Sequence, residues 1–381
     1  MENNNDNKVL NVPHLRFPEF TEEWRSHFLT DFMSFKNGMN PDAKRFGRGT
    51  KFISVMDILN NQFICYDNIR ASVEVMDGDI DTYGVNYGDI LFQRSSETLE
   101  DVGQANVYLD SKPAIFGGFV IRGKSKGNYN PLFFRYLLAS PTARKRIIVK
   151  GAGAQHFNIG QDGLSKVSLD IPCMQEQKKI GELLQCIDAR IATQNKIIEK
   201  LQSLIKGLAV ALTTKEKANI AISQCLECHS STLQESEVLS SGLCKVFGAN
   251  GLVGYKDVPQ MNGDAILVIK DGSGVGTVSY AQGKFSVIGT LNYLTVIGNN
   301  DLRYLYFALS VFNFQPYKTG MAIPHIYFKD YGKAKIYCPS LAEQKRVANV
   351  LDKLESKLFV EQELLASFNQ QKLYLLGKMF I

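Results

Sequence analysis

The sequence contains no run of 18 apolar residues, the length expected of a membrane-spanning helix. Its first residues, MENNNDNKVLNVP, are polar and include no apolar segment of the kind found in secretory leaders. We therefore expect no membrane span, and a disordered leader over residues 1–13. The seven cysteines are odd in number and irregularly spaced, which predicts reduced thiols and a cytoplasmic location rather than a disulfide framework.

An excess of charge of either sign is also missing. The 381 residues carry 43 Lys and Arg against 38 Asp and Glu, a formal net charge of +5. A hydrophobic content of 45% and a charged content of 21% are ordinary for a globular chain, and the length allows two or three domains. The mild positive charge permits a polyanionic partner such as DNA, but it fits a solvated surface equally well.

Motifs for nucleotide, haem or metal chemistry are few, and each has the wrong context. Residues 118–125 fit the phosphate-binding pattern G-x-x-x-x-G-K-[ST], yet the Phe-Val-Ile-Arg between the glycines predicts a strand where that motif needs a loop. Residues 225–229, CLECH, match a haem-attachment pattern but supply only three zinc ligands, which favours an unliganded loop. Residues 272–276 lack the third glycine of the dinucleotide-binding pattern.

Catalytic constellations are missing as well. There is no Asn-Pro-Pro-Tyr-type motif for base methylation, no recognisable pair of metal-binding carboxylates and no nucleophile–base set. The sequence therefore predicts no catalytic residue, no metal site and no cofactor. The scattered histidines are expected to be structural, and the last two named are expected to share a position of the repeat described next: His14, His27, His229, His156 and His325.

What the sequence does contain is a long helical pattern that occurs twice. Over residues 172–214 apolar residues recur at alternating steps of four and three, which is typical of a coiled-coil seam. Residues 338–381 repeat the pattern, and the tripeptide Glu-Gln-Lys at 176–178 recurs at 343–345. A long-period repeat of this kind predicts two copies of one unit, each a globular part followed by a helix.

The two globular parts share an order of expected elements, which follow from turn, cap and alternation signals. Residues 15–24 are expected to form a packed arm. In the first copy strands are predicted at 52–55, 90–92, 105–109, 119–121 and 167–171, with helices beginning after Asn130 and Ser140. In the second copy strands are predicted at 266–269, 285–288 and 293–297, with a helix capped by Asn300.

Two divergent globular units, each followed by a helix that opens with Pro-x-x-x-Glu-Gln-Lys at Pro172 and Pro339, resemble the specificity subunit of a type I restriction–modification enzyme. LRFPEFTEEW at 15–24 and the Gly-Asp strand entries at 88–89 and 263–264 are also similar to that family. The resemblance implies an α+β fold with a pseudo-two-fold internal repeat. Its parts would be globular α/β target recognition domains at 1–171 and 215–337, and long antiparallel helices forming a coiled coil at 172–214 and 338–381.

The same resemblance implies a role without an active site. Each target recognition domain would read one half of a bipartite double-stranded DNA target, and the helices would set the spacer. Two methyltransferase (modification) subunits would dock on the chain, and restriction/translocase subunits would join them. On the residues alone, a coiled-coil scaffold with two protein-binding domains remains open, and an NTPase resting on residues 118–125 is a weaker third possibility.

Sequence reading requires side chains at base edges, with Lys and Arg on phosphates. Loops of the two globular parts supply these residue types, although solvated loop charges that never touch DNA are the alternative for each. The candidates are Lys44, Arg45, Arg48, Arg94, Ser95 and Ser96 in the first part, and Lys270, Asp271, Ser273 and Lys318 in the second.

Helix pairing is expected to use residues of the repeated seam. If the helices pair antiparallel about a pseudo-two-fold axis, the polar residues Gln194 and Glu361 meet near the crossing. A buried polar pair there would fix the register at some cost in stability. The expected seam residues are Ile187, Ile191, Gln194, Ile198 and Leu201 in the first helix, and Leu354, Leu358, Glu361, Leu365 and Phe368 in the second.

Overall fold

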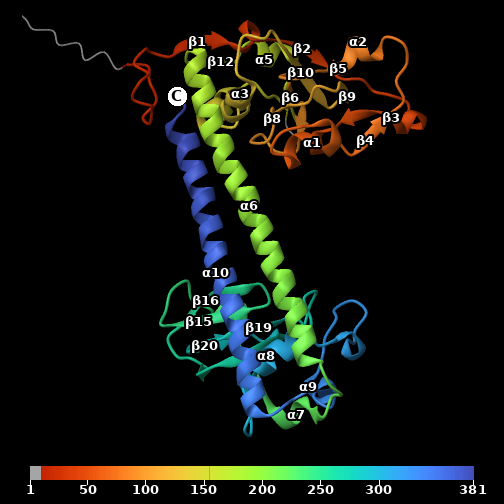
Figure 1. Ribbon diagram of the computed structural model, residues 1–381, viewed down its shortest axis with the longest axis vertical. Coiled ribbons are helices and arrows are strands. Elements are labelled where there is room, and N and C mark those ends of the chain that lie inside the picture. The colour runs from red at the N-terminus through yellow and green to blue at the C-terminus, as the bar shows by residue number, and fades with distance from the viewer. Residues whose placement is uncertain (1–9, 154) are drawn as a thin grey trace, which may run out of the picture. The chain divides into compact units, whose positions relative to one another are not determined.

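The structure is a computed structural model that describes residues 10–153 and 155–381. The chain forms two compact units: unit 1 is Met1–Gln194 with Leu364–Ile381, and unit 2 is Asn195–Glu363. Two long helices, α6 (Met174–Thr213) and α10 (Leu341–Lys378), each contribute one part to either unit (Figure 1). No helix among the described residues is both long and apolar enough to cross a membrane.

Unit 1 is built on two four-stranded sheets. The first is antiparallel with the order β2-β10-β6-β8, and the second, β4-β3-β9-β5, contains one parallel pair, β3 with β9. Two-stranded pairs β1-β12 and β7-β11 lie outside them. The bounds are β1 (Arg25–Phe28), β2 (Met33–Asn37), β3 (Phe46–Ile53), β4 (Ala71–Val73), β5 (Gly84–Val85), β6 (Ile90–Gln93), β7 (Ser95–Ser96), β8 (Ala105–Val107), β9 (Ala114–Phe116), β10 (Val120–Ser125), β11 (Phe157–Asn158) and β12 (Ser168–Ile171).

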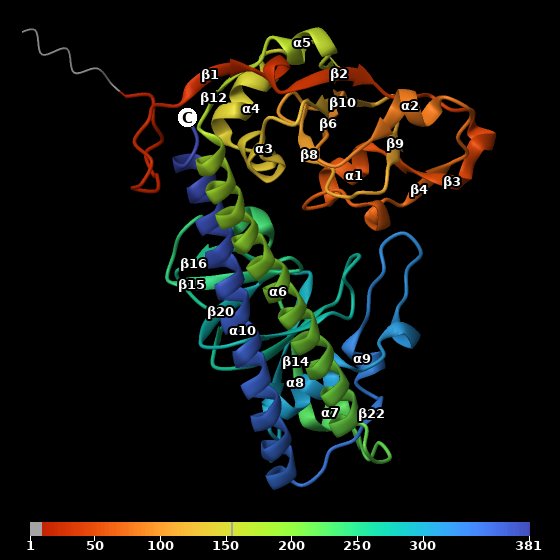
Figure 2. The ribbon, with the colours of Figure 1, turned by 45° about the horizontal axis from the view of Figure 1, so that its top comes forward.

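Two of the short helices in unit 1 begin where the caps predict. The Asn130 side chain accepts from the Phe133 N–H at 2.9 Å and that of Ser140 accepts from the Ala143 N–H at 3.2 Å, and proline follows each cap. In Figure 2 these helices lie beside the start of α6. The bounds are α1 (Val55–Asn60), α2 (Asp79–Tyr83), α3 (Pro131–Leu137), α4 (Pro141–Ile148) and α5 (Gln161–Ser165).

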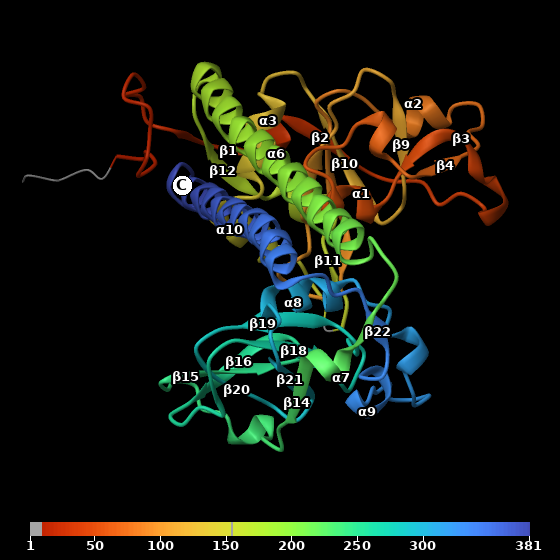
Figure 3. The ribbon, with the colours of Figure 1, turned by 60° about the horizontal axis from the view of Figure 1, so that its bottom comes forward.

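Unit 2 repeats three of the four sheets of unit 1. Its antiparallel sheet has the order β14-β21-β18-β19, its mixed sheet β16-β15-β20-β17 again has one parallel pair, β15 with β20, and β13 pairs with β22 (Figure 3). The bounds are β13 (Ile220–Ala221), β14 (Leu226–Ser230), β15 (Cys244–Gly248), β16 (Gly251–Lys256), β17 (Met261–Asn262), β18 (Ala265–Ile269), β19 (Val278–Ala281), β20 (Lys284–Val287), β21 (Leu291–Val296), β22 (Lys335–Ile336), α7 (Ile222–Cys225), α8 (Leu302–Ser310) and α9 (Phe328–Tyr331).

The glutamine of each Glu-Gln-Lys tripeptide ties a long helix to its globular part. Gln177 Oε1 accepts from the Asn130 N–H at 3.0 Å, while its Nε2 donates to the Pro172 carbonyl at 3.0 Å. Gln344 makes the same two bonds, from the Asp301 N–H at 2.8 Å and to the Pro339 carbonyl at 2.8 Å. Both glutamines are buried, so the repeated tripeptide is a structural joint between the long helix and the cap of a short one.

A second contact between long helix and globular part, about three helical turns after the glutamine, also occurs in both units. The Tyr136 hydroxyl donates to Asp188 on α6 at 2.8 Å, and the Tyr306 hydroxyl donates to Glu355 on α10 at 2.9 Å. Each carboxylate also meets a cation: Lys372 lies 2.7 Å from Asp188, and Arg303 lies 2.6 Å from Glu355. In unit 1 the cation comes from α10, so this contact also holds the two long helices to each other within that unit.

The seam of the long helices is buried as the heptad pattern predicts. All ten expected seam residues are buried or half-buried, including Gln194 and Glu361, whereas most of the residues between them are exposed. In unit 1 Ile180 and Leu184 of α6 share a core with Leu375 of α10, and in unit 2 Ala209 shares one with Val347. The first part of α6 thus packs with the last part of α10, which is an antiparallel pairing. That Gln194 meets Glu361 stays a prediction.

The N-terminal arm is ordered from an earlier point than expected. The expected leader at residues 1–13 lies partly outside the described residues, but Asn11 donates to the Trp24 carbonyl at 2.9 Å and to Asp170 at 3.1 Å, so its last residues are structured. Trp24 is buried, and Arg16 forms an ion pair of 2.7 Å with the buried Glu176. The packed arm is therefore confirmed, and the leader prediction is wrong beyond residue 9.

Two element predictions need correction. The strand expected at 52–55 is β3, which begins at Phe46 and ends at Ile53. It ends there because Ser54 is the N-cap of α1 and Val55 is the first residue of that helix. The cap of α8 is Asp301, whose carboxylate accepts from the Tyr304 N–H at 2.9 Å. The predicted cap, Asn300, instead donates to the Ile297 carbonyl at 3.1 Å.

Candidate nucleic-acid interface

The candidates that follow β6 are brought against a segment far away in sequence. Ser95 and Ser96 form β7, which pairs with Phe157–Asn158 of β11, and the Ile159 N–H donates to the Arg94 carbonyl at 2.9 Å. Asn158 also closes its own loop by two backbone bonds to Ala152, of 2.8 and 2.9 Å. We call residues 94–96 with 151–153 and 155–158 the first loop pair.

Unit 2 assembles the same arrangement after β18. The Ile326 N–H donates to the Lys270 carbonyl at 2.9 Å, Asp271 bridges to His325, and His325 closes its loop by two backbone bonds to Thr319, of 2.8 and 2.9 Å. We call residues 270–273 with 319–325 the second loop pair. Lys270 thus occupies the position of Arg94 in the other unit. The main-chain N–H of each residue donates at 2.9 Å to the turn before the equivalent strand, β10 in unit 1 and β21 in unit 2.

This equivalence corrects the predicted place of the histidines. The residue that matches His325 is Asn158, because each of them closes its loop and bridges to the residue after the cation. His156 lies two positions earlier, inside the loop. The prediction that His156 and His325 share a repeat position is therefore wrong, because five residues separate the closing pair in both loops and His156 takes the place of Ile323.

Side chains of the two loop pairs differ in charge and hydrogen bonding. In the first pair Arg94 Nη1 donates to the Gly118 carbonyl at 3.3 Å, and the Ser95 hydroxyl donates to the Asn158 side chain. In the second pair Lys270 and Asp271 are half-buried and Ser273 is exposed, with Lys318 half-buried one residue before the loop. The backbone frame is shared while its polar groups are not, which suits two sites of different specificity.

Lys44, Arg45 and Arg48 lie elsewhere in unit 1, around the start of β3. Arg45 donates to the Glu74 carbonyl at 2.7 and 2.9 Å and pairs with Asp79, so its guanidinium holds the chain between β4 and α2. The Met76 N–H and then Arg45 hold the pKa of Asp79 below its usual value. Arg48 pairs with Glu74 at 2.6 Å but stays exposed, and Lys44 is exposed.

A cavity lies beside the start of β3. Its volume is about 380 Å³, and its lining includes Asn40, Phe46 and Phe119. The Phe119 carbonyl accepts from the Arg94 N–H at 2.9 Å. Phe119 thus links this cavity to the backbone of Arg94, whereas Lys44, Arg45 and Arg48 are not among its lining residues.

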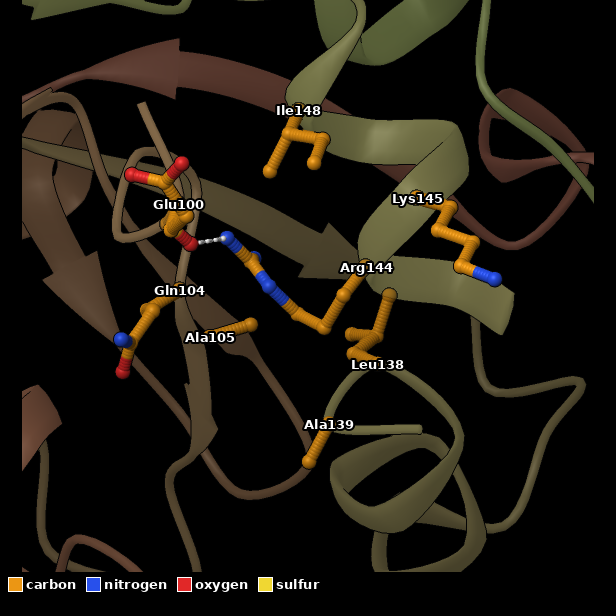
Figure 4. A pocket seen from close by; sticks show the side chains of 8 residues that line it. All are labelled: Glu100, Gln104, Ala105, Leu138, Ala139, Arg144, Lys145 and Ile148. Atoms are coloured by element: carbon orange, nitrogen blue, oxygen red, sulfur yellow. Dashed lines mark hydrogen bonds between the residues drawn. The ribbon is translucent and has the colours of Figure 1, made fainter. Parts of the chain in front are cut away.

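Arg144 supports the first loop pair without belonging to it. Its Nη2 donates to the Glu100 carbonyl at 2.9 Å (Figure 4). The same Nη2 donates to the Val102 carbonyl at 2.6 Å, and the two bonds fix the segment that follows Ser96. Burial lowers the pKa of this guanidinium from its ordinary value. A cavity of about 430 Å³ lies beside it. The sequence shows only a cation on a short helix, and nothing in its spacing reveals this distant partner.

The motifs that suggested other chemistry are parts of the sheets. Residues 120–125 form β10, whose backbone pairs with β2 and β6, so they do not wrap around a phosphate. Cys225 ends α7 and Cys228 lies in β14, so the expected loop at 225–229 is a helix–strand junction, which corrects that prediction. Among residues 10–153 and 155–381, no three His, Cys, Asp or Glu side chains are grouped as a metal site would require.

Together these features define a class of protein: a tandem α/β chain whose two units share one topology, one helix joint and one loop frame with unlike side chains. Comparison with known families identifies the class. The model of the type I restriction modification DNA specificity domain matches residues 21–203 and 229–370. The chain belongs to this family, the specificity subunits of type I restriction–modification enzymes.

Individual relatives agree with the family match. A putative type I restriction enzyme specificity subunit of Methanocaldococcus jannaschii is 26% identical over 213 residues, which cover 55% of this chain and 49% of that protein. The chain spans about half the length of the curated relatives it matches. The crystal structure of the S subunit from M. genitalium superposes with a TM-score of 0.65 at 17% identity, covering 97% of this chain and 99% of that one.

A second solved structure concerns complex assembly and conformational transition of the type I R-M system. It superposes with a TM-score of 0.57 at 13% identity, covering 96% of this chain and 98% of the other. At these identities the structural likeness shows the fold alone. The fold is the predicted one: two globular α/β parts with two long antiparallel helices.

Proposed function

We propose that this chain is the DNA sequence-recognition subunit of a type I restriction–modification complex, without catalytic residues of its own. Each unit reads one half of a bipartite double-stranded DNA target. The observation that carries the proposal is the loop frame common to both units, with a cation, Arg94 or Lys270, at the same backbone position. A split target with unlike halves needs this combination of one frame and two sets of side chains.

The roles we propose for the candidates follow from their chemistry and exposure. Arg94 and Lys270 suit the acceptor atoms of guanine, and Asp271 suits the amino group of cytosine. Ser95, Ser96 and Ser273 suit either base edges or phosphates, whereas Lys44, Arg48 and Lys318 suit phosphates. Arg45 is a positioning residue, because its Nε and Nη2 donors are occupied within the unit.

The long helices set the spacer between the half-sites and dock two methyltransferase subunits, which restriction/translocase subunits then join in the cytoplasm. A helix of 40 residues extends about 60 Å and is stiff enough to act as a spacer. Both helices also expose large apolar side chains, which favours a protein partner on their outer faces. They include Ile197, Leu204 and Val210 on α6, and Phe359, Val360, Leu364, Leu373 and Tyr374 on α10.

The test is DNA binding by the purified complex of this chain with its methyltransferase subunits. Duplexes that differ in the first half-site, in the second half-site or in spacer length are compared at constant salt. We expect each of the three changes to weaken binding, by about 1–3 kcal/mol for each altered base pair. Binding that is indifferent to half-site sequence and to spacer length would favour a coiled-coil scaffold that binds proteins.

A further inference from the structure

The loop of the second loop pair carries apolar side chains that touch little of the protein. Met321 is fully exposed, at 106% of its reference surface, and Ile323 is 66% exposed. Single exposed apolar residues are common on protein surfaces. Two of them within three residues on one loop, next to a proline, make an apolar tip that water solvates poorly.

This tip stands on a fixed base. Thr319 and His325 exchange two backbone hydrogen bonds, and His325 Nδ1 lies 3.2 Å from the Ile323 carbonyl oxygen. The base is in turn held to the other half of the loop pair, because the Gly272 N–H donates to the Pro324 carbonyl at 2.9 Å. A rigid loop loses little conformational entropy when its tip is inserted into a partner.

The turn at the tip depends on a glycine. Gly320 has φ +87°, a left-handed conformation that favours glycine, and a Cβ at this position would lie 2.3 Å from the Ile323 carbonyl oxygen. The chain therefore folds back tightly at this point. Met321 follows directly and is placed in solvent.

Charges around the tip favour a nucleic acid over an apolar protein surface. Lys318 precedes the loop, and Lys270 lies where the loop docks, at the position equivalent to Arg94. Asp271, bridged to His325, is the acidic group at the base. Methionine, isoleucine and proline are among the apolar side chains that DNA-binding proteins insert between base steps.

We propose that Met321 and Ile323 form a wedge that inserts between adjacent base pairs of the second half-site and unstacks them, while Lys318 holds a flanking phosphate. The inference rests on the proposed function and adds to it a mode of recognition. Specificity at this half-site then depends partly on how easily its sequence is deformed, because flexible pyrimidine–purine steps unstack at lower cost.

The described residues of the corresponding loop in unit 1 form no such tip. Between the closing pair Gly153, Gln155 and His156 are small or polar, and Phe157 is half-buried against the core of the unit. The wedge is therefore specific to the second half-site, and the first half-site is read by polar side chains. This asymmetry supplies an internal control.

The experiment uses the complex of the full chain with its methyltransferase subunits and a target identified by mapping methylated bases in cells. Duplexes carry 2-aminopurine, which brightens when it is unstacked, at successive positions of either half-site. We compare the unaltered chain with Met321→Ala/Ile323→Ala and with Leu243→Ala. Leu243 is a matched control in unit 2, since it is 84% exposed and outside the loop pair.

We expect unstacking at one step of the second half-site and none in the first. The double substitution should abolish that signal and weaken target binding at least about tenfold, the scale of burying one or two apolar side chains. Leu243→Ala should leave both unchanged. Neither variant should alter thermal unfolding, because the side chains are exposed.

Three results would overturn the wedge. The signal could persist in the double variant. The unaltered complex could show no unstacking, and the double substitution could weaken binding only as much as replacing the thymines of the half-site by uracil does. That result would indicate that the tip contacts a thymine methyl group. The double variant could lose methyltransferase subunits instead of DNA, which indicates a protein partner. If the unaltered complex shows no sequence preference at all, the proposed function itself has failed.

Discussion

Arg94 and Lys270 occupy the same backbone position in the two units, although a sequence comparison places them one residue apart. The Gly-Asp pairs at 88–89 and 263–264 align Lys270 with Ser95. β18, however, has five residues where β6 has four, so the cation follows one position later. The sequence predicted the residues correctly as loop cations of two copies, but their equivalence depends on strand lengths that only the structure shows.

At the residue scale, Lys270→Ala should weaken binding to targets with the correct second half-site by about 1–3 kcal/mol and relax preference at one position only. The reason is that we propose a contact between Lys270 and a base edge of this half-site. Competition binding with single-base variants of both half-sites measures this. Lys284→Ala, an exposed cation at the start of β20, is the control and should leave preference unaltered. Equal losses at both half-sites would contradict readout by this loop.

Arg45→Ala should reduce stability more than specificity. The Met76 N–H and Arg45 lower the pKa of Asp79 in the folded chain, so their stabilisation is present above the unfolded pKa of about 3.9 and is lost as pH falls through the lower folded value. The melting temperature of the variant should be lower than that of the unaltered chain at pH 7. The difference should shrink near pH 3.

The control for this prediction is Arg48→Ala, which removes a more exposed guanidinium and an exposed ion pair. It should change the melting temperature little. A difference for Arg45→Ala that stays constant from pH 7 to pH 3 would show that Asp79 does not contribute. A selective loss at one half-site with unchanged stability would restore Arg45 as a direct DNA contact.

At the element scale, the long helices were the most predictable part of the fold. A stripe sustained over 40 residues identifies α6 without knowledge of its partner, because its period is local. The mixed sheets were the least predictable. Strands such as β5 and β22 have two residues each, and the parallel pair of β3 with β9 joins distant segments, so no local pattern defines them.

The contacts that join each long helix to its globular part could be predicted from the sequence as a repeated motif, but the hydrogen bonds that make them could not. The repeated Glu-Gln-Lys suggested a shared helix start, and the structure gives each buried glutamine the same two hydrogen bonds to its globular part. The caps differ between the units, since Asn130 serves in one and Asp301 in the other. The prediction of Asn300 failed because Asn and Asp stand side by side there, and either suits a cap.

Gln177→Ala should destabilise unit 1 by about 1–3 kcal/mol, since the Asn130 N–H would lose its acceptor and the Pro172 carbonyl would lose the donor of a buried hydrogen bond. Chemical denaturation of the full chain, followed by hydrogen exchange at the α3 amides, measures this. Gln175→Ala is the matched control, because Gln175 lies two residues earlier on α6 and is exposed. Equal effects of the two substitutions would contradict the role of the joint.

At the scale of the whole molecule, the account depends on the helices as spacers. Inserting seven residues into both α6 and α10 keeps the seam in phase and lengthens each helix by about 10 Å. The preferred spacer should grow by about three base pairs, with both half-site sequences unchanged. Binding to duplexes with graded spacers measures this.

The control inserts the same seven residues between Thr214 and Asn219, outside both helices and before β13. This change should leave the spacer preference as it was. An unchanged preference after the paired helix insertion would show that something other than α6 and α10 sets the spacer.

The most direct test of the central claim is the map of methylated bases in cells that carry this chain together with its methyltransferase subunits. We predict one bipartite motif, with two defined halves separated by a fixed number of arbitrary bases, and relaxation of one half alone when Lys270 is replaced by alanine. A continuous motif, or a pattern of methylation that does not depend on this chain, would contradict its role as the subunit that reads the target.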